Sequence, residues 1–478
     1  MTDEDLCFLP ATELLDHYRH RRLSPVEVTE AVLGRIDRLN PIINAFITVT
    51  PELALEQARE AERAHVAGDI VGPLAGVPIS IKDLTPTRGI RTTRGSLIDP
   101  EWVPDYDAPF VERVYAAGAV MLGKTNTPEY GWKGDSGNRL VGPTHNPWRL
   151  GRTAGGSSGG GAAAVAAGLG PLAQGSDGAG SIRIPSAFCG IFGVKPSFGL
   201  VPQYPPSAVG DLSHLGPMTR TVRDAALLLT VTAGRDTRDR LSWSSGIDYL
   251  ASIDGNGNVR GMRVAWSPDL GYAPVAPAVR RATKAAIAHF EDLGANVEEV
   301  NPGLPDPWDI LDPLWACGMA AIHQENLDQV RDKLDPGRLA VIERASRFSG
   351  VDLASAMRRR EAYRDDLRRF MSKYDLLLTP TLPITAFAAG EDHPGEIAGV
   401  ETTYLNWTAF TYPFNISGQP AATVPCGFDN EGLPIGLQIV GRWHDDTAVL
   451  RAAAAFETIA PWSMHRPDEA MALSSMED

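Results

Sequence analysis

Residues 155–183 read GGSSGGGAAAVAAGLGPLAQGSDGAGSIR, and this stretch decides how the chain is interpreted. Two glycine-rich segments, 155–161 and 175–183, flank a run of small apolar residues that favours a helix. Glycine lets backbone N–H groups and hydroxyls converge on one point, and the start of a helix adds a dipole that favours an anion. Ser157 and Ser181 therefore lie in segments suited to holding a developing negative charge, although a flexible glycine turn has the same composition.

A strand is predicted upstream, where residues 77–83 read VPISIKD. Strand alternation places the valine and both isoleucines on one face and Ser80 with Lys82 on the other. If helices cover both faces of the sheet, Lys82 is buried, and burial favours the neutral amine that can act as a base. A lysine that leaves the strand end to pair with Asp83 would show the same local pattern.

Other periodic segments predict an α/β fold. Short apolar runs bounded by turn residues predict buried strands at residues 77–81, 119–122, 376–378 and 437–440. Helices are predicted from a capping box at residues 24–27, over 277–293, and over 358–369, where mixed charges indicate a solvated face. Residues 251–258 and 389–399 have the composition of surface loops.

Charge and cysteine usage narrow the classes of function. The chain has 478 residues with 44 basic and 59 acidic side chains, and its net charge of -15 opposes binding to a polyphosphate backbone. Cys7, Cys189, Cys317 and Cys426 form no CxxC pair, and the histidines show no HExxH spacing. Because no long uncharged apolar run is present either, we expect a cytoplasmic protein that contacts neither nucleic acid nor membrane and needs no metal.

The lysine on a strand, the Gly-Gly-Ser-Ser-Gly-Gly loop and the Gly-Ser-Ile-Arg serine, in this order, resemble the amidase signature family. The resemblance extends over nearly the whole chain, through the segments NPIINAF (40–46), GPLAGVP (72–78), GKTNTPE (123–129), FGVKPS (192–197), GPMTRT (216–221) and GLPIGLQ (432–438). It implies one amidase domain over residues 1–478, with a signature core at about 65–220. Its fold would be a large mixed β-sheet sandwiched between α-helices.

The resemblance also implies a catalytic triad that needs no cofactor. Ser181 would attack the substrate, Ser157 would be a bridging serine held by a cis peptide bond, and Lys82 would be the base. The oxyanion would be bound by the backbone N–H groups of residues 178–181, namely Gly178, Ala179, Gly180 and Ser181. The family usually has a glycine where this chain has Ala179, and we expect the added methyl group to narrow the approach to the carbonyl oxygen.

The substrate implied by the resemblance is a small amide, anilide or carbamate, cut through an acyl-enzyme, and a homodimer is compatible with it. The alternative within the family is the glutamine-hydrolysing component of a tRNA-dependent amidotransferase. That branch typically has Asp-Gln before Gly-Pro, whereas residues 213–217 here read SHLGP. The Gly131 carbonyl is expected to face the acyl side, and an apolar pocket is expected from Trp132, Trp407, Phe410, Tyr412 and Phe414, which could equally be core aromatics.

Two motifs suggest other classes of protein. Residues 118–125, GAVMLGKT, fit the letter of a nucleotide-binding P-loop, but their interior reads as a strand rather than a glycine-rich turn. Residues 155–159 fit the GxSxG elbow of an α/β-hydrolase esterase, which requires a preceding strand and a histidine base. Residues 147–152 are a poor strand by composition, and the candidate bases would be His323, His393 and His444.

Overall fold

One large mixed sheet runs through the middle of the computed structural model, which describes residues 1–254 and 258–468. Its strands are β1 (Phe46–Val49), β2 (Pro78–Lys82), β3 (Val120–Thr125), β6 (Leu172–Asp177), β7 (Phe192–Lys195), β8 (His214–Thr219), β9 (Arg263–Trp266), β10 (Asn296–Glu299), β11 (Leu376–Pro380), β14 (Ala421–Phe428) and β15 (Pro434–Gly441). They lie in the order β1-β3-β2-β6-β8-β7-β14-β15-β11-β9-β10. β2 is parallel to β3 and β6, whereas β14 is antiparallel to β7 and β15. All four predicted strands are present in this sheet.

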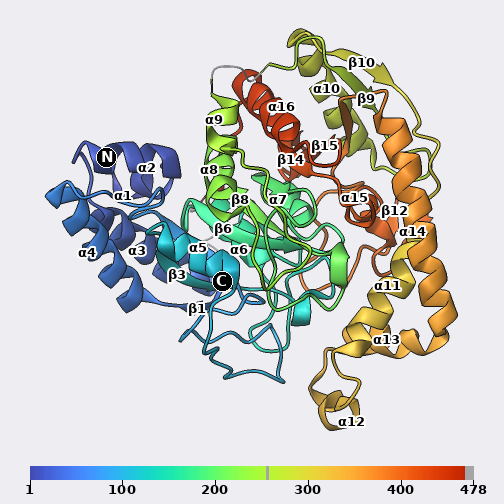
Figure 1. Cartoon of the computed structure of the whole chain (residues 1–478), viewed down its shortest axis with the longest axis horizontal. Coiled ribbons are helices and arrows are strands. Elements are labelled where there is room, and N and C mark those ends of the chain that lie inside the picture. The colour runs from blue at the N-terminus through green and yellow to red at the C-terminus, as the bar shows by residue number, and fades with distance from the viewer. Residues whose placement is uncertain (255–257, 469–478) are drawn as a thin grey trace.

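Helices lie on both sides of the sheet and at its two ends (Figure 1). They are α1 (Asp3–Cys7), α2 (Ala11–Arg19), α3 (Pro25–Ile43), α4 (Pro51–Ala67), α5 (Pro109–Ala116), α6 (Gly159–Ala166), α7 (Arg183–Cys189), α8 (Val222–Thr232), α9 (Tyr249–Ile253), α10 (Pro277–Asp292), α11 (Trp308–Ala321), α12 (Leu327–Val330), α13 (Pro336–Arg344), α14 (Gly350–Met371), α15 (Tyr412–Ser417) and α16 (Asp446–Ile459). The sheet includes strands from both halves of the chain, so no part of it is a separate layer.

Strand β2 shows why Lys82 is buried. Ile79 and Ile81 pack in an apolar cluster with Phe110 of α5 and Leu228 of α8 on one face of the sheet. Lys82 lies on the other face, which α6 covers, and it is 0 % exposed. The predicted alternation is confirmed, and the lysine is enclosed because both faces carry helices.

Local signals placed two helices correctly. The Ser24 side chain accepts a hydrogen bond from Val26 N at 2.9 Å, and Glu27 accepts one from Ser24 N at 2.9 Å, which starts α3 with the predicted capping box. α10 ends at Asp292, as the glycine two residues later indicated. On both helices the apolar face packs inward.

Three local predictions need correction. Residues 251–253 are the last turn of α9, capped by the Asp248 side chain, and not a loop; residues 255–257 lie outside the described part of the chain. Residues 389–399 are mostly loop but contain β12 (Glu396–Ile397), which pairs with β13 (Val400–Glu401). Residues 149–153 do form a strand, β5 (Arg149–Thr153), because it pairs with β4 (His145–Asn146) in a hairpin outside the main sheet.

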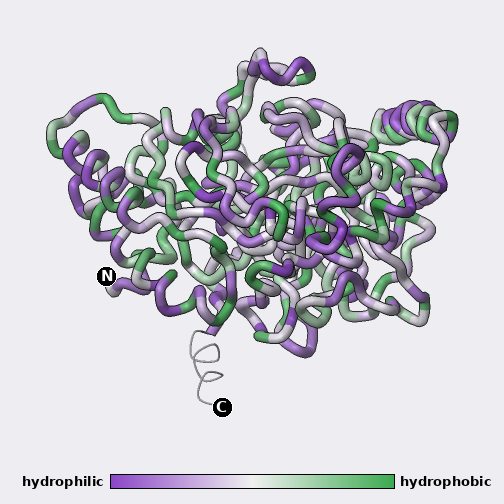
Figure 2. Tube along the Cα trace, turned by 90° about the horizontal axis from the view of Figure 1, so that it is seen from below, coloured by the Kyte–Doolittle hydropathy of each residue, from purple (hydrophilic) through white to green (hydrophobic). Residues whose placement is uncertain are grey.

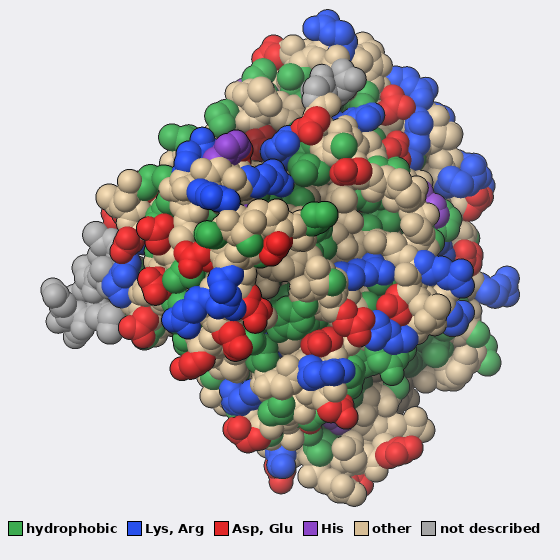
Figure 3. All heavy atoms as spheres, turned by 60° about the vertical axis from the view of Figure 1, so that its left-hand side comes forward, with side chains coloured by type: hydrophobic (Ala, Val, Ile, Leu, Met, Phe, Trp, Pro, Cys, Tyr) green, Lys and Arg blue, Asp and Glu red, His purple; other side chains and the backbone are tan. Residues whose placement is uncertain are grey.

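The surface helices carry mixed charges. α14 holds ion pairs such as Arg368–Asp365 at 2.7 Å and Arg364–Glu361 at 3.0 Å, as predicted for a solvated face, although Arg360 is buried and binds Asp211. Figure 2 shows hydrophilic and hydrophobic residues alternating along the peripheral helices, and Figure 3 shows acidic and basic side chains interspersed on one face of the molecule. Across residues 1–254 and 258–468, no helix combines the length and apolar character needed to cross a bilayer.

Two carboxylates lie at the N-terminal end of α8. Asp224 accepts hydrogen bonds from Ala11 N at 2.8 Å and Thr12 N at 2.9 Å, which attaches the start of α2. Glu457 of α16 accepts one from Val222 N at 3.1 Å. Burial raises the pKa of Glu457 to about 8, and the charge of Asp224 adds to the rise although the Val222 hydrogen bond opposes it.

We therefore expect Glu457 to reduce stability at alkaline pH. In the unfolded chain a glutamate ionises near pH ~4.3, so the folded state loses free energy relative to the unfolded state as pH rises from there to about 8. Glu457→Gln should raise Tm by about 2–4 °C at alkaline pH and by nothing at pH ~4. Thermal unfolding across this range measures it, with the exposed Glu60→Gln as the matched control. A Tm difference that is the same at every pH would contradict the assignment.

Candidate active site

Lys82 ends β2 among three hydroxyl groups. Its Nζ lies 2.7 Å from Ser157 Oγ, 2.9 Å from Ser158 Oγ and 2.9 Å from Ser176 Oγ. Its backbone N–H donates to Gln174 Oε1 at 3.1 Å, which fixes the strand end against β6. The structure thus brings the predicted lysine and the predicted bridging serine into direct contact.

The environment of Lys82 favours the neutral amine. Burial lowers the pKa of Lys82 well below its usual value, and the charge of Asp177 opposes this only in part. Asp83 does not pair with it, because the Asp83 carboxylate turns to accept hydrogen bonds from Thr93 N at 2.9 Å and Thr93 Oγ1 at 2.5 Å. Lys82 can therefore accept a proton at neutral pH.

The loop before α6 holds Ser157 in an unusual backbone conformation. The peptide bond between Gly156 and Ser157 is cis, as the resemblance implied. A side chain at Gly156 would meet backbone atoms of Asp135 at 2.7 Å, so glycine is required by this close approach. Ser136 Oγ donates to Ser157 O at 3.3 Å and accepts from Gly159 N at 2.8 Å, which ties the loop to its neighbour.

Ser181 lies between β6 and α7, on a segment organised by Asp177. The Asp177 carboxylate accepts hydrogen bonds from Gly180 N at 2.6 Å and from Ile182 N at 3.2 Å, on either side of the serine. It also pairs with Arg183, with Nε 3.0 Å from Oδ2. Burial alone would raise the pKa of Asp177, but the Arg183 guanidinium brings it well below its usual value, so the carboxylate is ionised.

A cavity of about 330 Å³ opens onto both serines. Ser157, Ser176 and Ser181 line it together with Gly131 and Gly178. Ser181 is 7 % exposed, so the nucleophile candidate is reachable only through this cavity. A side chain at Gly131 would lie 3.2 Å from Ser157 Oγ, which places that glycine beside the bridging serine as predicted.

The predicted effect of Ala179 is wrong. Its side chain is 3 % exposed and packs in an apolar cluster with Trp315, away from the cavity wall. Its carbonyl accepts a hydrogen bond from Thr411 Oγ1 at 2.6 Å, which turns the residue toward α15. The methyl group therefore leaves the approach to Ser181 unchanged.

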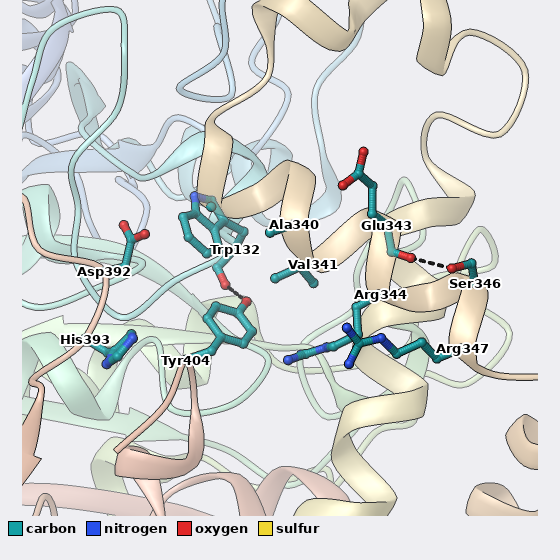
Figure 4. Close-up of a pocket in the computed structure, with 11 residues that line it drawn as sticks. Trp132, Ala340, Val341, Glu343, Arg344, Ser346, Arg347, Asp392, His393 and Tyr404 are labelled. Atoms are coloured by element: carbon teal, nitrogen blue, oxygen red, sulfur yellow. Dashed lines mark hydrogen bonds between the residues drawn. The ribbon is translucent and has the colours of Figure 1, made fainter. Parts of the chain in front are cut away.

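Trp132 does not line this cavity. Its ring stacks on Tyr404, with centroids 5.3 Å apart, and its carbonyl accepts a hydrogen bond from the Tyr404 hydroxyl (Figure 4). Both residues line a separate cavity of about 590 Å³, together with Arg344. The other proposed pocket aromatics are core residues at most 2 % exposed and absent from the cavity wall, namely Trp407, Phe410, Tyr412 and Phe414.

The apolar wall comes from residues that the sequence analysis missed. Trp315, Met319 and Ile322 line the cavity from the end of α11, and Tyr130 lines it from the turn before Gly131. Their spacing of four and three residues marks one helix face, a pattern that core helices share. Trp315 approaches the Ser181 segment so closely that a side chain at Gly178 would meet its ring at 3.0 Å.

The competing motifs do not form their sites. Lys124 of the P-loop-like segment is buried in β3 and donates to Thr85 O at 2.6 Å. In the elbow-like segment, Ser157 contacts Lys82. The three candidate histidines have other partners: His323 lies 3.1 Å from Asn326 Oδ1, His393 lies 3.0 Å from Pro394 O, and His444 stacks on Trp243. Among the residues that the structure describes, no cluster of three metal-ligand side chains occurs.

Comparison with known proteins gives one family over the whole chain. The family model described as Amidase matches residues 27–450. An acylamidase of Rhodococcus erythropolis is 42% identical over 483 residues, covering 99% of this chain and 100% of that protein. The A-type component of the glutamyl-tRNA(Gln) amidotransferase of Moorella thermoacetica is 37% identical over 97% of this chain and 99% of its own length.

A solved structure agrees with these sequence matches. The crystal structure of a bacterial aryl acylamidase of the amidase signature enzymes superposes with a TM-score of 0.90 at 34% identity, covering 95% of this chain and 97% of that one. The same fold, matched over nearly both full lengths, accompanies the sequence similarity. The chain belongs to the amidase signature family and is an amidohydrolase that acts on C–N bonds other than peptide bonds.

Proposed function

We propose that Ser181 is the nucleophile, Ser157 the proton bridge and Lys82 the base of an acyl-enzyme mechanism. The observation that carries the proposal is the 2.7 Å contact of Lys82 Nζ with Ser157 Oγ beside a cavity that also reaches Ser181. A neutral amine has two N–H hydrogens and one lone pair, so it can donate to two of its three hydroxyl neighbours and accept from the third. In this proposal the lone pair faces Ser157, and Ser158 and Ser176 accept the two N–H groups.

The protons follow this chain of hydroxyls in both half-reactions. As Ser181 Oγ attacks the carbonyl carbon, its proton passes to Ser157 Oγ and the Ser157 proton passes to Lys82 Nζ. When the C–N bond breaks, the protons return along the same path to the nitrogen, and the amine leaves neutral. Water then repeats the attack on the acyl-enzyme, which releases the acid and restores Ser181.

The proposed oxyanion donors follow from the hydrogen bonds of the segment. The Gly180 N–H already donates to Asp177, so it is committed in this conformation. We infer that the N–H groups of Gly178, Ala179 and Ser181 bind the oxyanion, in a segment that Asp177 holds still. Donors fixed before the reaction stabilise the developing charge without reorganisation.

For the substrate we propose a small amide, anilide or carbamate with an apolar part. The cavity wall includes Trp315, Met319 and Tyr130, which suit an aromatic or aliphatic group, and no carboxylate among the described residues lines it. The ammonium group of glutamine would enter without an anionic partner, at a desolvation cost. The similarity to an acylamidase and to an aryl acylamidase supports this choice, whereas the similarity to amidotransferase components keeps glutamine hydrolysis as the alternative.

Ser181→Ala should lower turnover of an anilide by about 10⁴-fold or more, because no other group forms the acyl-enzyme. Peptide mapping after brief treatment with a fluorophosphonate should find the label on Ser181, and circular dichroism should show the variant folded. A label on Ser157 would instead favour the esterase alternative.

Lys82→Ala should reduce kcat/KM for an anilide by about 10²–10⁴-fold, because a poor leaving amine needs the returned proton. The loss on an activated ester should be smaller, since its leaving group needs no proton. Lys82→Arg should not restore activity, because a guanidinium stays protonated. With a lowered pKa for Lys82, wild-type kcat/KM should remain high at neutral pH and fall only as acid protonates the amine. Near-wild-type amidase activity in folded Lys82→Arg would disprove the relay.

An aryl amide such as acetanilide should be cleaved with a kcat/KM at least about 100-fold above that for free glutamine, because glutamine must desolvate an unpaired ammonium group. Initial rates of aniline and ammonia release by the purified protein measure the two reactions. Equal values would support the amidotransferase alternative.

A further inference from the structure

The cavity that reaches Ser181 has one charged side chain on its wall among the described residues, Arg94. Lys82 and Asp177 lie behind the wall, and the remaining lining groups are apolar, hydroxyl or amide groups. The electrostatic character of the cavity therefore depends on this guanidinium. No part of the triad requires a cation at this position.

The backbone of Arg94 is fixed between two parts of the site. Its φ of 56° lies in the left-handed region, where the chain makes a sharp turn. Its N–H donates to Asp83 O at 3.1 Å, next to Lys82, and its carbonyl accepts from Tyr130 N at 2.8 Å, next to Gly131. The residue thus joins the end of β2 to the turn that lines the cavity.

The side chain of Arg94 is held in place as well. Its guanidinium carbon lies 4.1 Å from the ring centroid of Trp102 and 5.6 Å from that of Tyr130. Nη1 lies 3.3 Å from Asp99 Oδ2, which also accepts a hydrogen bond from the Tyr130 hydroxyl at 2.6 Å. A guanidinium stacked in this way loses little further freedom when it binds a ligand.

The pairing with Asp99 leaves the positive charge available. A strong charge-assisted hydrogen bond is about 2.7–2.9 Å long, and the contact with Asp99 is longer, at 3.3 Å. Asp99 does not line the cavity, whereas Arg94 does. A guanidinium has five N–H donors, and this contact is made by Nη1, so its other edge can face a ligand.

We propose that Arg94 is a specificity-determining residue that binds a carboxylate, or another anionic group, carried by the substrate away from the scissile bond. The substrates of the cavity are then neutral or anionic amides, and cationic amides are disfavoured. This inference rests on the proposed amidase function and adds the charge of the substrate to it. A carboxylate fits because its two oxygens match the fork of a guanidinium.

Wild-type enzyme tests the proposal with matched substrates. Acetanilides carrying para CH₂CO₂⁻, CH₂CH₃ or CH₂NH₃⁺ place the charge on the amine side, and succinanilate against butyranilide places it on the acyl side. In at least one series kcat/KM should favour the anion, by about tenfold over the cation or about fivefold over the neutral compound, mainly through KM. The preference should shrink as salt rises from about 0.01 M to about 1 M. The series that responds reports which side of the substrate Arg94 faces.

Substitutions separate Arg94 from the overall charge of the protein. Arg94→Met should lower the anion-to-neutral ratio of kcat/KM about fivefold or more, and Asp99→Asn should raise it by removing the competing carboxylate. Arg88→Met changes the net charge equally at an exposed residue of the same loop and should leave the ratio unchanged. Because each result is a ratio within one variant, a partly active variant is still informative.

The proposal is overturned if neither wild-type series favours the anion, or if folded Arg94→Met keeps the wild-type ratio in both. Should Arg94→Met fail to fold, the salt dependence of the wild-type ratio decides the question. Turnover of the neutral anilide tests the amidase function separately, so the failure of one proposal cannot be mistaken for the failure of the other.

Discussion

The buried carboxylate of Asp177 fixes the segment that carries Ser181. It accepts hydrogen bonds from the backbone on both sides of the serine and from Asn415 Nδ2 at 2.8 Å, and it pairs with Arg183. Arg183 in turn donates to Gln438 Oε1 of β15 at 2.8 Å. Through these contacts one ion pair connects the end of β6, α7, α15 and the far half of the sheet. Removing one partner would leave a buried charge uncompensated, which typically costs about 3–5 kcal/mol.

Burial by itself does not make a lysine a catalytic base. Lys82, Lys124 and Lys195 are all fully buried, and burial lowers the pKa of each. Lys124 donates to Thr85 O and Lys195 donates to Gln419 O, and a carbonyl oxygen has no proton to pass on. Lys82 differs because its neighbours are hydroxyls, two of which line the cavity. The partners of the amine, rather than its depth, distinguish the proposed base from two structural lysines.

The sequence predicted the features that depend on neighbours along the chain. The alternation of β2, the capping box at Ser24 and the two glycine-rich loops are local patterns, and the structure contains all of them. The wall of the cavity depends on contacts between distant segments, so composition could not separate Trp315, which lines it, from Trp407, which is a core residue. Trp132 shows the same limit at short range. The positive φ values of Tyr130 (51°) and Gly131 (75°) turn the chain, and the tryptophan next to a cavity residue packs elsewhere.

The Asp177–Arg183 pair also bears on the protonation of Lys82. A carboxylate near a buried lysine stabilises the ammonium form, and the charge of Asp177 does raise the pKa of Lys82. Burial outweighs it, and Arg183 places a compensating positive charge on the same carboxylate at 3.0 Å. A lone carboxylate at this position could order the Ser181 segment equally well, but it would favour a protonated lysine that cannot accept a proton. An ion pair meets both requirements at once, because its hydrogen bonds hold the segment while its nearly cancelled charge leaves the amine neutral.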